Sequence, residues 1–175
     1  LKHIIQVRTG GDSKHLTIEG VIEKAELTKE NLEALEKRRP DPNEVAQIMP
    51  TGGTTGTPKL SPRTHNNYMV NVEYHAKSWE ITSNDTVMVV TPVGHGMALH
   101  WGIGGSLFNQ AKLVLLDSVK PEDICAAIEK DKVTAMPTVP ALLARMVEME
   151  GFGKFRLDSL KKVCVGGAPS TPELV

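Results

Sequence analysis

One stretch in the first third of the chain concentrates hydrogen-bond donors around a single cation. Residues 51–59 contain three glycines, four threonines and one lysine: Gly52, Gly53, Gly56, Thr51, Thr54, Thr55, Thr57 and Lys59. Glycines allow sharp turns that bring backbone N–H groups close to a ligand. Threonine hydroxyls add donors, and lysine supplies a positive charge for phosphate oxygens. Because no acidic residue occurs from Val45 to Met69, the stretch predicts a loop that binds a polyphosphate.

Other loop types fit less well. A Gly/Thr-rich surface turn is the simplest alternative, because such turns are common, but the crowding of donors around one lysine favours the phosphate loop. A Walker loop needs glycine directly before the lysine and Ser or Thr after it, whereas Pro58 and Leu60 flank Lys59. A dinucleotide fingerprint, Gly-x-Gly-x-x-Gly, is also excluded. Gly102 and Gly104 match its first two glycines, but Leu107 stands at the position of the third.

The loop and two later segments resemble the adenylate-forming enzymes, which include acyl- and aryl-CoA synthetases, peptide-synthetase adenylation domains and luciferases. Segment 51–59, Thr-Gly-Gly-Thr-Thr-Gly-Thr-Pro-Lys, is similar to their signature loop. Its continuation Leu60–His65 is similar to the subgroup that activates aryl acids, such as dihydroxybenzoate-AMP ligases. Pro92–Met97 resembles the family's Pro-x-x-His segment, and Val165–Pro169 resembles its adenine-binding Gly-Gly-Ala segment.

This resemblance implies an activity and a set of site residues. ATP and Mg²⁺ would activate a carboxylic acid as an acyl-adenylate, followed by transfer to coenzyme A or to the phosphopantetheine of a carrier protein. Lys59 and His95 are the candidate catalytic residues. The nucleotide is expected at Thr51, Gly52, Gly53, Thr54, Thr55, Gly56, Thr57, Lys59, Gly166, Gly167, Ala168 and Pro169, and the acid at His95, Gly96, Met97 and Trp101. No metal-ligating residue is predicted, because His95 and His100 stand apart from carboxylates and cysteines.

The expected acid pocket departs from the dihydroxybenzoate pattern. Gly96 and Trp101 replace the asparagine and the small hydroxylic residue that those ligases usually have. We therefore expect a pocket poor in hydroxyl partners, suited to a plainer aromatic, alicyclic or fatty acid. Met97 and Trp101 fit core positions equally well, and His95 alone also fits a structural turn. His3, His15, His65 and His75 receive no role.

Strands alternate with helices along most of the chain, which predicts an α/β fold with a largely parallel sheet. The resemblance implies part of the large N-terminal domain of an adenylate-forming enzyme. Residues 1–44 are expected to form an N-terminal strand and connector, and residues 45–175 the ATP/AMP-binding subdomain. The expected strands are 45–49, 86–91, 112–116, 133–136 and 160–165, and the expected helices are 65–79, 97–110, 121–132 and 140–150. Each of the three motifs follows an expected strand, so they should meet at one sheet edge.

Composition excludes some partners. Twenty basic and twenty-one acidic residues give a formal net charge of −1, so no basic excess points to nucleic acid or an anionic membrane. The apolar runs are too short for a membrane span, and the absence of a secretory pattern predicts a cytoplasmic location. Cys125 and Cys164 are unpatterned and are expected to be small buried hydrophobes.

The chain lacks the family's Tyr-Gly-x-Thr-Glu segment and its C-terminal lysine domain. We therefore expect a piece of a longer ligase that is inactive alone. A non-catalytic nucleotide-binding module is the alternative function. A phosphotransferase is less favoured, because no candidate base lies near Lys59 in the sequence.

Overall fold

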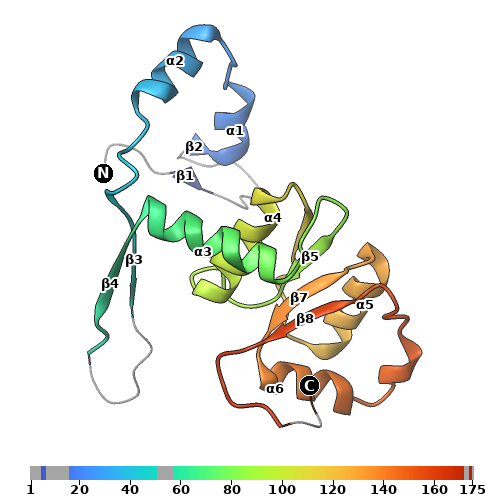
Figure 1. Ribbon diagram of the computed structural model, residues 1–175. Coiled ribbons are helices and arrows are strands. Elements are labelled where there is room, and N and C mark those ends of the chain that lie inside the picture. The colour runs from blue at the N-terminus through green and yellow to red at the C-terminus, as the bar shows by residue number, and fades with distance from the viewer. Residues whose placement is uncertain (1–4, 7–15, 51–56, 172–173, 175) are drawn as a thin grey trace. The chain divides into compact units, whose positions relative to one another are not determined.

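The structure is a computed structural model that describes residues 5–6, 16–50, 57–171 and 174 of the chain (Figure 1). The chain divides into two compact units, Leu1–Asp41 and Pro42–Val175. Within the described ranges, no helix has the length and apolar character needed to cross a membrane. The functional division expected between residues 44 and 45 stays a prediction.

The first unit pairs two very short parallel strands, β1 (Ile5–Gln6) and β2 (Leu16–Thr17). Helices α1 (Ile18–Glu23) and α2 (Lys29–Lys37) follow. A threonine hydroxyl at the N-cap of each helix accepts a backbone N–H from the first turn, over 3.1 Å in both cases. None of the expected site residues lies in this unit.

The second unit contains the remaining elements. In chain order they are β3 (Val45–Pro50), β4 (Leu60–Thr64), α3 (His65–Ser78), β5 (Thr86–Val89), the π-helix η1 (Met97–Gly104), α4 (Gly105–Phe108), β6 (Lys112–Leu115), α5 (Pro121–Asp131), β7 (Ala135–Thr138), α6 (Pro140–Glu148), the 3-10 helix η2 (Phe152–Lys154) and β8 (Lys162–Val165). Strands β6, β5, β7 and β8 form a parallel sheet in that order. This arrangement confirms the expected α/β fold.

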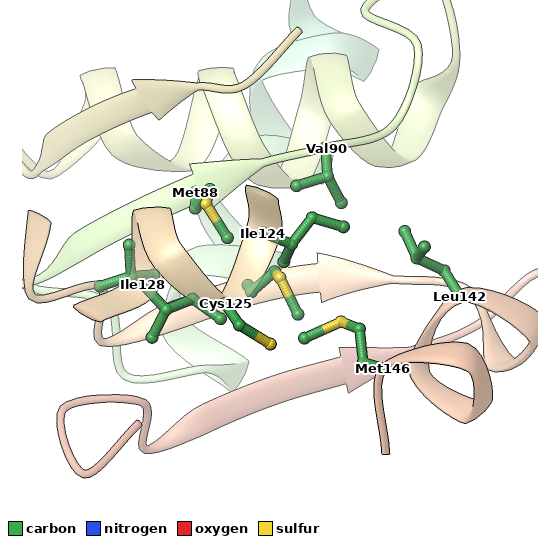
Figure 2. Close-up of a cluster of buried hydrophobic side chains, with 9 residues drawn as sticks. Met88, Val90, Ile124, Cys125, Ile128, Leu142 and Met146 are labelled. Carbon is green, nitrogen blue, oxygen red and sulfur yellow. The ribbon is translucent and has the colours of Figure 1, made fainter. Parts of the chain in front are cut away.

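The main core lies between this sheet and helices α5 and α6. Strand side chains alternate between the two faces of a sheet, so Met88 of β5 and Met136 of β7 both point to this side. Figure 2 shows Ile124 and Ile128 of α5 and Met146 of α6 within the same cluster. All five side chains are at most 2% exposed, which makes this cluster the rigid support for the opposite face.

The two cysteines occupy apolar surroundings. Cys125 is fully buried in the core cluster, as expected, whereas Cys164 on β8 is half-buried. Burial raises the pKa of both thiols to about 11. Both thiols are therefore protonated at neutral pH.

Helix η1 crosses the opposite face of the sheet and differs from the single α-helix expected over 97–110. A π-helix spans Met97–Gly104 and an α-helix covers only Gly105–Phe108. Glycines explain the close packing, because a Cβ on Gly102 would lie 2.2 Å from Val89 Cγ2 and one on Gly104 would lie 2.6 Å from Val72 Cγ2. The glycines of this segment permit such close packing, but the sequence carries no signal for the wider helical turn.

The expectation that β3 would join the same sheet edge is wrong. Strand β3 instead pairs antiparallel with β4, and the two form a separate hairpin. Strand β4 was not predicted, because Leu-Ser-Pro-Arg-Thr contains a proline and no apolar alternation. Proline removes a ladder donor and is tolerated in a two-stranded ribbon, where each strand has an unpaired edge. The phosphate-loop segment therefore connects the strands of a hairpin.

A buried carboxylate joins the N-terminal ends of three sheet strands. Asp85, 7% exposed, accepts a hydrogen bond from the Thr134 hydroxyl over 2.7 Å and one from Lys162 Nζ over 2.9 Å. The Thr82 backbone N–H and hydroxyl also donate to Asp85. Burial opposes ionisation of Asp85, but the four hydrogen bonds outweigh it and lower the pKa of its carboxyl from 3.8 to about 2.

Candidate active site

A cleft of about 460 Å³ opens within the second unit. It lies where the β3–β4 hairpin, α3, the start of η1 and the turn after β8 meet. The residues that line it are Met49, Pro50, Ser61, Arg63, Asn71, His75, His95, Gly96, Met97, His100, Trp101 and Gly167. Among these described lining residues none is acidic, so the cleft suits an anionic ligand.

The four residues expected to bind the acid, His95, Gly96, Met97 and Trp101, all line this cleft. Met97 and Trp101 stand one turn apart on η1 and reach the turn after β8. A Cβ on Gly166 would lie 3.4 Å from Met97 Cε and 3.8 Å from Trp101 Cη2. The small residue at 166 therefore leaves room for these two side chains.

His95 sits in a turn that fixes its ring. Its backbone N–H donates to Pro92 O over 2.9 Å, and its Nδ1 accepts the Met97 backbone N–H over 3.2 Å. A neutral imidazole that accepts at Nδ1 carries its proton on Nε2. His95 can therefore offer Nε2–H as a donor to a ligand in the cleft.

Two further histidines, to which the motifs assign no role, also line the cleft. His100 is 5% exposed, and its Nε2 lies 3.2 Å from Gln47 Oε1. Burial lowers the pKa of His100, and the positive charge of the Arg63 guanidinium lowers it further. His100 is therefore neutral at pH 7 and donates to Gln47.

His75 of α3 packs its ring against Trp101, with 4.3 Å between the ring centroids. Burial lowers the pKa of His75 as well, which keeps this ring neutral at pH 7. Asn71 lies one turn earlier on the same helix face and also lines the cleft. The i, i+4 spacing of these two polar residues, on the helix that follows the β3–β4 hairpin, is the signal that points to them in the sequence.

The expected phosphate loop lies only partly within the described residues. Thr51–Gly56 lie outside the described residues, while Thr57, Pro58 and Lys59 are exposed and precede β4. Pro50 and Ser61, which lie on the two hairpin strands on either side of the loop, both line the cleft. Lys59 itself is not among the residues that line the cleft.

The expected adenine segment follows β8. Gly167 lines the cleft and has a φ of +88°, in the left-handed region that favours glycine. Ala168 and Pro169 are exposed next to it, so backbone and small side chains face a prospective ligand. A flat ring such as adenine needs small residues and exposed backbone beside it, as this segment offers.

The described residues do not form a metal site. Among them, no three His, Cys, Asp or Glu side chains are grouped closely enough to hold an ion. Mg²⁺ prefers carboxylate and phosphate oxygens, and the described lining of the cleft has no carboxylate. The residues present therefore do not fit a protein-held magnesium ion.

Comparison with known proteins matches residues 2–175 to the family model described as AMP-binding enzyme. A salicylyl-CoA synthase / salicylate adenylyltransferase from a Streptomyces species is 33% identical over 80% of this chain and 26% of its own length. A salicyl-AMP ligase / salicyl-S-ArCP synthetase from Mycobacterium tuberculosis is 35% identical over 76% of this chain and 24% of its own length. These matches confirm the resemblance to aryl-acid ligases.

The fold is similar to that of a solved relative. The apo structure of MbtA from Mycobacterium smegmatis aligns with a TM-score of 0.67 and 35% identity, over 75% of this chain and 24% of that chain. The chain thus spans about a quarter of the length of the relatives it matches.

Proposed function

This chain belongs to the AMP-binding enzyme family, and from that premise we propose that it forms part of an ATP-dependent, AMP-forming carboxylic acid ligase. The acid would be activated as an acyl-adenylate with release of pyrophosphate, and then transferred to a thiol such as coenzyme A or a carrier-protein phosphopantetheine. The observation that carries this proposal is the cleft, where His95, Trp101 and Gly167 meet the two ends of the phosphate-loop hairpin.

The reaction brings a carboxylate oxygen onto the α-phosphorus of ATP while pyrophosphate leaves. Both reactants are anionic, so the site must neutralise charge and hold an in-line geometry. Loop residues 51–57 and Lys59 would hold the departing phosphates. His95 Nε2–H would donate to an oxyanion that forms in the cleft, and Gly167 and Ala168 would lie against the adenine. Mg²⁺ would stabilise phosphate charge when bound, but the described residues assign no ligand to it.

The acid would lie beside Met97 and Trp101, in space that Gly96 and Gly166 leave open. Aryl, alicyclic and fatty acids fit these apolar surroundings, and the names of the two curated relatives specify salicylate. Asn71 and His75 add polar groups that were not foreseen. A preference for acids with fewer ring hydroxyls than dihydroxybenzoate stays a prediction.

Pyrophosphate exchange by the full-length enzyme tests the proposed function. Radiolabelled pyrophosphate should enter ATP only when a suitable acid is present, in a panel of benzoate, salicylate, 2,3-dihydroxybenzoate, cyclohexanecarboxylate and a medium-chain fatty acid. The acid-free reaction is the control, and His95→Ala should lower the exchange rate. ATP binding without exchange for any acid would favour the non-catalytic nucleotide-binding module instead.

A further inference from the structure

Arg63 is the one arginine among the described residues that line the cleft. It lies on β4 opposite Gln47 of β3, and shares the cleft with His95 and Gly167. Ser61, two residues earlier on the strand, also faces the cleft. Strand alternation therefore places Arg63 on the cleft side of the hairpin.

The guanidinium of Arg63 is poorly satisfied by the protein. Its Nη1 donates to Asn67 Oδ1 over 3.1 Å, while its Nε is buried and has no hydrogen-bond partner. None of the ion pairs found among the described residues involves Arg63. A guanidinium carries five N–H donors, and the contact with Asn67 is the one side-chain hydrogen bond found for it among the described residues, so donors remain for a ligand.

The described surroundings of Arg63 add positive potential, and none of the ion pairs found there gives it an acidic partner. Helix α3 starts two residues later and has no acidic residue in its first turn, so the positive end of the helix lies next to the guanidinium. The cation at Lys162, by contrast, is paired with the Asp85 carboxylate over 2.9 Å. Among the described residues, the cation at the N-terminal end of the sheet is therefore paired with a carboxylate, whereas the cation in the cleft is not.

We propose that Arg63 binds an oxyanion of the reacting pair, either the carboxylate of the acid or an α-phosphate oxygen of the nucleotide. The planar guanidinium fork matches two oxygens of either group, and the cleft holds no competing carboxylate among its described lining residues. This inference rests on the proposed function, because that function brings both anions into the cleft. It gives Arg63 a binding role distinct from those of Lys59 and His95.

Calorimetric titration of the full-length enzyme with benzoate, benzamide and AMP tests the role of Arg63. If Arg63 holds the carboxylate, Arg63→Met weakens benzoate binding by roughly 10- to 100-fold, as for loss of a charge-assisted contact, and leaves benzamide binding unchanged. If Arg63 holds the phosphate, the same variant weakens AMP binding instead. Arg63→Lys keeps the positive charge but lacks the planar guanidinium. Its affinity for the affected probe should lie between those of Arg63→Met and the wild type.

Arg156→Met is the matched control, because Arg156 is an exposed arginine paired with Glu129 over 3.2 Å. It should bind all three probes as the wild type does. Wild-type binding of benzoate and AMP by Arg63→Met would overturn the proposal, and so would an equal loss for all three probes, which indicates a structural role. If Arg63→Met does not fold, the affinities of Arg63→Lys for benzoate, benzamide and AMP are compared with those of the wild type in the same way.

The exchange assay on the same proteins separates this inference from the proposed function. If exchange depends on the acid but Arg63→Met binds benzoate and AMP as the wild type does, the inference is rejected and the ligase function is retained. Binding that depends on Arg63 in an enzyme without exchange supports the oxyanion site and rejects the ligase function.

Discussion

Replacing Gly102 with alanine should displace the π-helix that carries Met97 and Trp101. The new Cβ would lie 2.2 Å from Val89 Cγ2, whereas carbon atoms in contact lie about 3.5–4.0 Å apart. Val89 is 2% exposed and β-branched, so its side chain has little freedom to turn away. The helix must therefore shift by about 1–2 Å to restore ordinary contact.

The cost of this substitution follows from two opposing effects. Overpacking costs about 1–3 kcal/mol, and the higher helix propensity of alanine offsets about 1 kcal/mol of this cost. The net loss of unfolding free energy is up to about 2 kcal/mol. Because Met97 and Trp101 move with the helix, the KM for the acid should also rise.

Gly105→Ala is the matched control for Gly102→Ala, because the nearest atom to its new Cβ is Ala76 Cβ at 3.9 Å, an ordinary contact. Thermal midpoints and acid KM values of the full-length variants provide the measurement. Gly102→Ala should melt below the wild type, and Gly105→Ala at or above it. Equal midpoints and equal KM values in the two variants would refute the packing explanation.

Three further substitutions test other parts of the structure. Asp85→Asn should lower the free energy of unfolding by about 2 kcal/mol at neutral pH. Because folding lowers the pKa of the Asp85 carboxyl from 3.8 to about 2, the stabilisation by this carboxylate is present above pH 3.8 and is lost as the pH falls toward 2. Denaturant midpoints should therefore converge in acid, and a constant difference would contradict the prediction. Gly167→Val should abolish AMP binding in calorimetry without loss of circular-dichroism signal, because a φ of +88° strains valine and its side chain would cover the adenine surface; normal AMP affinity would show the placement to be wrong. Lys59→Ala should weaken ATP binding by about 1.5–3 kcal/mol, and unchanged affinity and turnover would exclude the loop lysine from the phosphate site.

The parallel sheet could be predicted from the sequence because its strands are short apolar runs separated by amphipathic helices. Val87 and Met88 of β5, and Ala135 and Met136 of β7, are buried on both faces of the sheet, which produces continuous apolar runs. The hairpin strand β4 lacks this signal. Its backbone pairs with β3, while its exposed and half-buried side chains form no apolar pattern.

Part of the lining of the candidate site could be predicted where its residues belong to a short motif. His95 and Gly167 belong to short segments, and both line the cleft. Asn71 and His75 were missed because they lie on a helix whose orientation depends on the packing of Ala76 and Val72 against the sheet and η1. The π-helix Met97–Gly104 could not be predicted, because π-helices are rare and the apolar composition of this segment fits an α-helix equally well.

In the proposed reaction, a carboxylate oxygen attacks the α-phosphorus of ATP. Incubating the full-length enzyme with ATP, a thiol acceptor and an acid labelled with heavy oxygen in its carboxylate tests this step directly, with mass spectrometry of the nucleotide product. We expect AMP that carries one labelled oxygen, because the bond from the carboxylate oxygen to phosphorus survives when the thiol displaces AMP. Formation of ADP, or of AMP without label, would contradict the proposed chemistry.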